Sequence, residues 1–345
     1  AKFHRPAALI LAGGAGLVTC LTFVWFSAPD LALTQLLVEI VTTVLMLLGL
    51  RWLPKRLPQR WSWDAARAAL PRRLRDLAIA IAGGGGLATV AYAAMTRGPN
   101  DTISGFFLTR AYPEGGGTNV VNVILVDFRG FDTLGEITVL AAVAVAVYSL
   151  LRRFRPARES VESPPQQRTL SGSTAADDLA VPAVLMRGMF APIAVFALFL
   201  LLRGHNLPGG GFAAGIALAV AFIVQYMASG TRWVEERVEL RPVRLMGLGL
   251  AVAAATGAGA WLFGHPFLTS HVAHIELPLV GALHLPSALL FDIGVFVLVV
   301  GATSLLLIAL AHQSLRAHRV EREAGEAGSQ RGDYARAGRR EEPGR

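Results

Sequence analysis

The chain has 345 residues, of which 53% are hydrophobic and 16% are charged, and its formal net charge is +8. An average soluble domain has about 25% charged residues. The low charge and the long apolar blocks exclude a soluble globular protein, a disordered chain, a collagen and a coiled coil. The single cysteine, Cys20, excludes an internal disulfide, a thiolate zinc site and a cysteine-bound iron–sulfur cluster.

Eight mostly apolar blocks of about 20 residues predict eight transmembrane helices, because each block can cross about 30 Å of hydrocarbon. Open strands are excluded, since a lipid-exposed backbone must satisfy its own hydrogen bonds. The fold class predicted is all-α, a polytopic membrane helix bundle. The predicted helices cover residues 7–26, 31–53, 77–96, 131–151, 182–202, 211–229, 243–263 and 288–310.

The basic residues predict the orientation of these helices. Lys and Arg gather in alternate gaps, chiefly 51–76, 152–181 and the tail after 311. By the positive-inside rule these gaps are cytoplasmic, and eight crossings place both termini on that side. The positive charge therefore indicates topology and not nucleic-acid binding. We interpret the first block as a true span and not a cleaved signal peptide, because of its length and the span that follows at once. The start at Ala1 suggests a piece of a longer product.

The pattern of polar segments predicts two membrane regions. Residues 152–180 are polar, rich in Pro and Ser and non-periodic, which is typical of a flexible cytoplasmic linker. Residues 1–151 and 181–312 each hold four predicted helices. Residues 313–345 are charged and Gly-rich, and they predict a disordered cytoplasmic tail. Within the predicted spans, glycines such as Gly247 and Gly249 indicate close helix packing.

Glu39 is an acidic residue near the middle of the second predicted helix. It lies about 12 Å along the axis, where a charge costs about 2.5–3.5 kcal/mol on an insertion scale. Gln35, Glu39 and Thr43 recur at four-residue spacing and form one polar stripe. A proton or cation relay is one interpretation, because strongly buried carboxyl groups often serve in proton transfer. A neutral glutamic acid that hydrogen-bonds a neighbouring helix is the alternative.

A second acidic cluster lies in the string DFRGFDTLGE, residues 127–136. The segment 119–128 is too short to span, so we expect a short helix on or dipping into the outer face. Asp132 and Glu136 share one face at the start of the fourth span, and the cluster also contains Asp127 and Arg129. Three carboxylates with one guanidinium suit ion transfer. A structural Arg129–Asp132 pair that caps the helix is the alternative.

Further polar groups lie near the predicted membrane rim. The string RGHNLPGGGF at 203–212 predicts a tight turn that carries His205 and Asn206. A structural turn is favoured over a ligand role. Asp292, early in the last predicted span, is either an interfacial carboxylate or a path residue. Four outer-loop histidines are interpreted as exposed neutral side chains and not as metal ligands: His265, His271, His274 and His284.

Several of these strings resemble the multisubunit Mrp-type (Mnh or Pha) cation/proton antiporters of bacteria. LALTQLLVEIVTTVLMLLGL, which begins at residue 31, and DFRGFDTLGE resemble the C-terminal part of the large A subunit. GHNLPGGGF and LLFDIGVFVLVVG, at 204–212 and 289–301, resemble the B subunit. The resemblance implies a fused A/B polypeptide and does not extend to the large N-terminal module of the A subunit.

The resemblance also implies a function. It implies exchange of cytoplasmic Na⁺ (or Li⁺, K⁺) for external H⁺ in the bacterial cytoplasmic membrane, by a hetero-oligomer of six or seven subunit types. The chain would be one subunit of a secondary transporter and not an enzyme, without a cofactor, a resident metal or a nucleic-acid partner. The family's acidic residues correspond here to Glu39, Asp127, Asp132 and Glu136.

Two other functions remain open from the sequence. The chain could be a purely structural assembly subunit. It could also be a membrane-arm subunit of a complex-I-like or hydrogenase-type oxidoreductase. Carboxylate-to-amide changes would separate assembly from transport, because a scaffold role predicts a lower yield of complex at unchanged specific activity.

Overall fold

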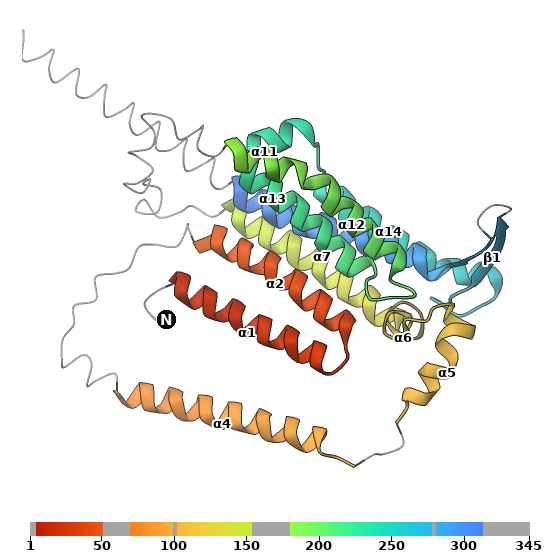
Figure 1. Cartoon of the computed structure of the whole chain (residues 1–345), viewed down its shortest axis with the longest axis horizontal. Helices are drawn as coiled ribbons and strands as arrows, with labels where there is room; N and C mark the ends of the chain where they lie inside the picture. The colour runs from red at the N-terminus through yellow and green to blue at the C-terminus, as the bar shows by residue number, and fades with distance from the viewer. Residues whose placement is uncertain (1–4, 51–69, 99–101, 154–179, 278–280, 313–345) are drawn as a thin grey trace, which may run out of the picture. The chain divides into compact units, whose positions relative to one another are not determined.

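The computed structural model describes residues 5–50, 70–98, 102–153, 180–277 and 281–312 (Figure 1). In this part of the chain, eight helices are long and apolar enough to cross a membrane. This confirms the predicted all-α membrane bundle, and each helix overlaps a predicted span. The orientation of the termini stays a prediction. Nearly all of the predicted linker and the whole predicted tail lie outside the described residues. The eight spans are Pro6–Trp25, Pro29–Leu50, Leu70–Met95, Gly130–Arg152, Val184–Arg203, Gly211–Ser229, Pro242–Phe263 and Ala288–His312.

The chain divides into two compact units, residues 55–107 and the remainder, 1–54 with 108–345. The smaller unit contains α4 (Leu70–Met95) and the first residues of α5 (Ser104–Gly115). The larger unit contains the other described elements and all of the residues discussed below as a site.

In the larger unit, α1 (Arg5–Trp25) and α2 (Pro29–Leu50) form a helical hairpin (Figure 1). Pro29 begins α2 and Asp30 lies in its first turn, where a fixed φ and a negative charge both favour a helix start. The buried thiol of Cys20 donates to the carbonyl oxygen of Ala32 at 3.2 Å. This contact ties the end of α1 to the start of α2.

The core of the larger unit lies between α13 (Gly211–Arg237) and the helix Ala288–His312, called here the last helix. These are the two most buried spans. α13 also contacts α2 and α12 (Phe190–Arg203). In addition, α14 (Pro242–Gly259) contacts α7 (Gly130–Arg153). Within the larger unit, helices before the predicted linker therefore pack against helices that follow it. The predicted span 182–202 is interrupted at Met189, which separates α11 (Ala180–Gly188) from α12.

The segment before α7 forms the short helix expected there. It consists of α6 (Val120–Val123) and a π-helical turn, η1 (Ile124–Phe128). Two other elements were not predicted. One is α5, and the other is an antiparallel hairpin of β1 (Val272–Leu277) and β2 (Gly281–Pro286), which follows the 3₁₀ turn η2 (Ala260–Phe263). The predicted outer loop with its histidines is thus partly a hairpin, in which His274 lies opposite His284.

Candidate functional site

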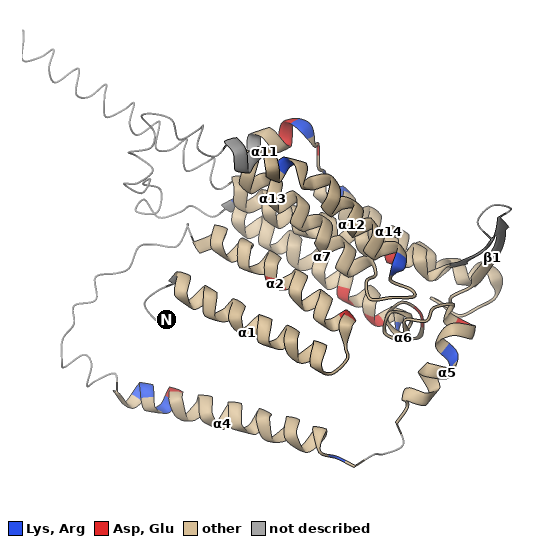
Figure 2. Ribbon diagram, viewed as in Figure 1, with Lys and Arg blue, Asp and Glu red and all other residues tan. Residues whose placement is uncertain are grey.

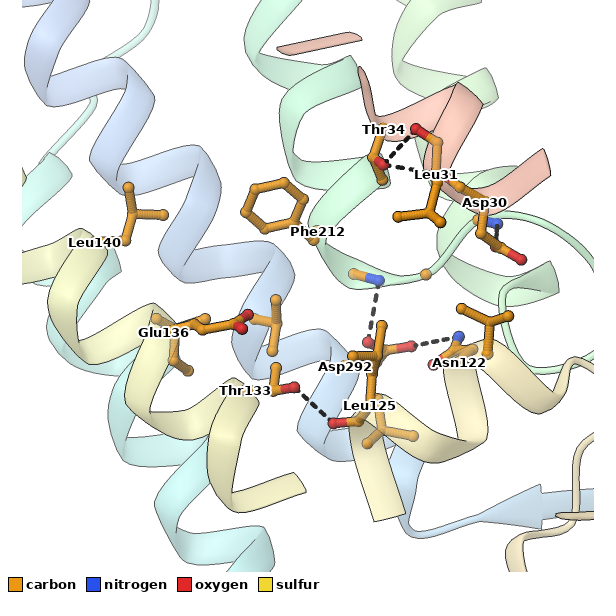
Figure 3. A pocket seen from close by; sticks show the side chains of 17 residues that line it. Asp30, Leu31, Thr34, Asn122, Leu125, Thr133, Glu136, Leu140, Phe212 and Asp292 are labelled. Atoms are coloured by element: carbon orange, nitrogen blue, oxygen red, sulfur yellow. Dashed lines mark hydrogen bonds between the residues drawn. The ribbon is translucent and has the colours of Figure 1, made fainter. Parts of the chain in front are cut away.

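A cavity of about 290 Å³ lies between α2, α6 with η1, α7 and the last helix. The turn from Gly209 to Gly211 closes it at the start of α13, and most of its wall is apolar (Figure 3). The polar side chains that line it are those of Asp30, Thr34, Asn122, Thr133, Glu136 and Asp292. Two residues predicted for the ion path, Glu136 and Asp292, therefore border one space.

Asp292 is the most buried carboxylate of this cavity, with 5% of its surface exposed. Its Oδ1 accepts a hydrogen bond from the backbone N–H of Gly211 at 3.1 Å, and its Oδ2 accepts one from the side-chain amide of Asn122 at 3.4 Å (Figure 3). Both donors are neutral. Within the described ranges, no Lys or Arg forms an ion pair with this carboxylate.

The three glycines of the predicted turn allow this contact. Gly210 has φ of +94°, which favours glycine, and its N–H donates to the carbonyl oxygen of Leu200 at 3.0 Å. A Cβ at Gly211 would overlap the backbone carbonyl of Asp292. The absence of side chains in the turn therefore lets the backbone N–H of Gly211 reach the carboxylate of Asp292. The favoured interpretation of a structural turn agrees with this geometry.

A second, partly buried network joins α2 to the same turn. Oδ1 of Asp30 accepts from the side-chain amide of Asn119 at 3.2 Å and from the N–H of Gly209 at 3.1 Å. The Asn119 amide also lies 3.0 Å from the Gly204 carbonyl oxygen, while Asn119 Oδ1 caps α6 by accepting from the N–H of Asn122. The polar wall thus continues from α2 through α6 to the last helix.

His205 lies in the first part of this turn and is 6% exposed. Its Nε2 lies 2.8 Å from the carbonyl oxygen of Gly115. A carbonyl only accepts, so Nε2 is the donor. Among the described residues, Nδ1 has no hydrogen-bond partner. Asn206, the next residue, is exposed, and its backbone carbonyl accepts from the Thr118 hydroxyl at 3.0 Å.

Asp127 does not line the cavity. It belongs to η1, and its Oδ1 accepts from the backbone N–H of Ser270 at 2.9 Å. Burial raises the pKa of the Asp127 carboxyl above its ordinary value, and the hydrogen bond from Ser270 and the charge of His205 oppose this rise. The carboxylate therefore links η1 to the segment before the hairpin.

Asp132 forms an ion pair with Arg129, and both side chains are substantially exposed. The i, i+4 spacing of Asp132 and Glu136 does not place them together in the cavity, because only Glu136 lines it. The pair at the start of α7 has the geometry of the structural alternative, with the N–H of Asp132 bonded to the carbonyl of Arg129.

Glu39 lies on the side of α2 that faces α1, away from the cavity. The Thr43 hydroxyl lies 3.5 Å from Glu39 Oε1, as the predicted stripe requires. The carboxylate lies against Gly13 and Gly16 of α1. None of the three residues of the stripe, Gln35, Glu39 and Thr43, lines the cavity. The predicted path residues therefore do not gather in one place, because Glu136 and Asp292 border the cavity while Glu39 lies on the α1 side of α2.

Five residues of the polar wall were not predicted from the sequence, because each had only a weak signal. Asp30 follows Pro29 and has the pattern of a helix start, and Thr34 follows on the same helix. Asn119 and Asn122 lie in a mainly apolar string, and Thr133 lies between the acidic residues that drew attention. Thr133 donates to the carbonyl oxygen of Leu125 at 2.6 Å.

Three family models match the chain in succession. They describe MbhD, one of the subunits of MBH, at residues 2–55; MbhE, another of the MBH subunits, at residues 71–168; and a domain related to the MnhB subunit of Na⁺/H⁺ antiporter, at residues 181–305.

Curated relatives match both predicted regions. A protein of Rhizobium meliloti, named as a probable K⁺/H⁺ antiporter A/B subunit, is 61% identical over 94% of this chain, which spans 34% of that relative. The Na⁺/H⁺ antiporter B subunit of Bacillus subtilis is 37% identical over 32% of this chain and 78% of the relative.

A solved structure has the same fold. A chain of the Mrp complex from Dietzia sp. DQ12-45-1b aligns with a TM-score of 0.76 and 30% identity, over 89% of this chain and 32% of that chain. The present chain therefore corresponds to about one third of the longer proteins that it resembles.

Proposed function

Because this chain belongs to the Mrp-type cation/proton antiporter family, with sequence of the A and B subunits in one polypeptide, we propose that it is a membrane subunit of a hetero-oligomeric antiporter. It exchanges Na⁺ or K⁺ (or Li⁺) for H⁺ together with other antiporter subunits. The bacterial cytoplasmic membrane holds the complex, with both termini of this chain on the cytoplasmic side. The relatives' names and the eight spans support this proposal.

The observation that carries the proposal is the buried carboxylate of Asp292 in the wall of the cavity. A carboxylate in this position, held by two neutral donors, can accept a proton or can help to bind a cation. Charge repulsion disfavours holding both at once. Alternate occupation by proton and cation is the property that an exchanger needs.

The cavity offers the other ligands that a cation requires. Glu136 adds a second carboxylate, and the side-chain oxygens of Thr34 and Asn122 are neutral oxygen ligands of the kind that bind hard cations. Each elementary charge that crosses the full potential changes in energy by about 2.3 kcal/mol per 100 mV. The charge carried in each cycle therefore decides whether voltage drives the exchange.

The other predicted path residues have separate places in this proposal. Glu39, with the Thr43 hydroxyl beside it, is a further carboxylate on the α1 side of α2, and Gln35 lies one turn before it. Asp127, whose carboxylate accepts from Ser270, and His205 and Asn206 of the turn are assigned in this proposal to the approach to the cavity. Arg129 and Asp132 form the ion pair at the start of α7, where they hold the end of the helix.

The test is Asp292→Asn in the complete complex, reconstituted in vesicles. The amide keeps the size of the side chain but cannot ionise. We expect cation-driven proton exchange, measured separately with Na⁺ and K⁺, to fall about tenfold or more, equivalent to about 1.4 kcal/mol. Asp76→Asn, at an exposed residue of α4 that pairs with Arg75, is the matched control. Normal exchange by Asp292→Asn would refute a role of this carboxylate in transport.

An assembly role is the second candidate, and the buried network favours it. Asn119 and Asn122 connect α6 to α2, to the turn and to the last helix. If Asp292→Asn lowers the yield of complex but leaves exchange per complex unchanged, the assembly role holds. The antiporter names of the relatives support ion exchange over the oxidoreductase alternative.

A further inference from the structure

Glu39 occupies an unusual place for a carboxylate, in the contact between two apolar helices. The face of α1 toward α2 contains Leu9, Gly13, Gly16 and Cys20. Leu9 and Cys20, at the two ends of this face, are buried. The Glu39 carboxylate lies against the two glycines in the middle of this face. Apart from the Thr43 hydroxyl, no hydrogen-bonding partner contacts it within the described ranges.

The three glycines of α1 differ sharply in what surrounds them. A Cβ at Gly16 would overlap the carboxylate of Glu39. A Cβ at Gly13 would lie 3.5 Å from Glu39 Oε1, an ordinary contact distance. A Cβ at Gly14 would have no atom within 4 Å. The carboxylate thus fills the space that any side chain at position 16 would take, and no such conflict exists at 13 or 14.

We propose that Gly16 is a positioning residue for Glu39, and that its missing side chain holds the carboxylate between α1 and α2. This inference rests on the proposed function, in which Glu39 is a titratable group of the transport machinery. With any larger residue at position 16 the carboxylate leaves the contact. The alternative place for it is the exposed edge of α2, which contains Leu36 and Ile40, because Leu37 and Val41 on the opposite side of α2 are buried in the core.

The neighbouring contacts make displacement of the carboxylate the expected response. Separation of the helices would expose Leu9 and break the hydrogen bond between Cys20 and Ala32. Rotation of a flexible glutamate side chain about its own bonds disturbs neither contact.

The experiment compares Gly16→Ala with Gly13→Ala and Gly14→Ala in the complete complex. Alanine is the better helix former at all three positions, so the variants share any gain in helix stability. A hydrophobic carbodiimide modifies carboxyl groups that are open to the lipid phase, and mass spectrometry of the peptide containing Glu39 gives the modification rate. We expect Gly16→Ala to raise this rate several-fold and the other two variants to match the wild type. Equal rates in all three variants would overturn the proposal.

A double variant covers the case in which Gly16→Ala does not assemble. Glu39→Asp shortens the side chain by one methylene and removes the overlap. We expect Gly16→Ala with Glu39→Asp to recover the yield of complex and the low modification rate. A double variant as defective as Gly16→Ala alone would refute the proposal.

The modification assay is independent of transport. If Glu39→Gln exchanges ions at the normal rate while Gly16→Ala still exposes Glu39, the transport role of Glu39 fails and the positioning role stands.

Discussion

The side-chain amide of Asn122 donates a hydrogen bond to Oδ2 of Asp292, a residue that lies 170 positions further along the chain. Both side chains are buried. The bond joins α6, in the region that matches the MbhE model, to the last helix, in the region that matches the MnhB-related model. One buried hydrogen bond thus connects the regions that two separate family models match.

Asn122→Leu tests the strength of this contact. Leucine keeps a similar volume but removes the donor, so Asp292 Oδ2 loses its side-chain partner. We expect a loss of about 1–3 kcal/mol, because a buried acceptor is left unsatisfied. Thermal dissociation of the complex, followed by size-exclusion chromatography, measures the loss. Thr138→Ala, at an exposed hydroxyl that bonds within its own helix, should leave the midpoint unchanged. An unchanged midpoint in Asn122→Leu would show that the bond adds nothing.

His205 offers a second test of the buried wall. Its Nε2 donates to the Gly115 carbonyl, which leucine cannot do and glutamine can. We expect His205→Leu to lower stability by about 1–3 kcal/mol, and His205→Gln to lower it less. The thermal midpoint of the complex is again the measurement. Equal losses in the two variants would indicate that ring packing, and not the hydrogen bond, stabilises this position.

The raised pKa of the Asp127 carboxyl predicts that the stability of the folded protein depends on pH. Burial raises the pKa of this carboxyl in the folded protein, so the folded state holds the proton more tightly than the unfolded chain. Its favourable contribution is therefore complete below about pH 3.8 and is lost as the pH rises through the folded pKa. Asp127→Asn cannot ionise, and its amide oxygen still accepts from Ser270.

We expect the thermal midpoint of the wild type to fall relative to that of Asp127→Asn as the pH rises from about 4 toward neutral. The two midpoints should converge at lower pH. A constant difference across this range would contradict the assignment of a raised pKa to Asp127. Asp76→Asn is the control for a general effect of removing one charge.

Gly249 and Gly247 provide a matched pair on α14. A Cβ at Gly249 would lie 2.6 Å from the carbonyl oxygen of Gly294, whereas a Cβ at Gly247 would meet no atom within 4 Å. Gly249→Ala should therefore cost about 1–3 kcal/mol through overpacking, and Gly247→Ala should be neutral or slightly stabilising. The yield and thermal midpoint of the complex test both. A neutral Gly249→Ala would show that the last helix can shift to make room.

The sequence predicted the spans well, because a run of about 20 apolar residues follows directly from the thickness of the bilayer. It also placed Glu39 and Thr43 on one face of α2, since helical spacing is a local property. It could not show which of Gly247 and Gly249 packs closely. That depends on the rotation of α14 relative to a helix 45 residues further along the chain.

The cavity was harder to predict for the same reason. Asp30 is 89 residues from Asn119 and 179 residues from Gly209. No local pattern relates these positions, so Asp30 indicates only the start of a helix. Asp132 and Glu136 illustrate the converse. Their spacing places them on one face of a helix, yet only Glu136 lines the cavity, while Asp132 pairs with Arg129.

Charged side chains concentrate near the ends of the described helices (Figure 2). Glu39 is an exception, because it lies near the middle of α2. This helix borders the cavity with Asp30 and Thr34, and it contacts α1 with Glu39 and Thr43. α2 has 22 residues and contributes to both places. We therefore expect a tilt of this helix that widens the space beside Asp30 to change the clearance at Glu39 as well.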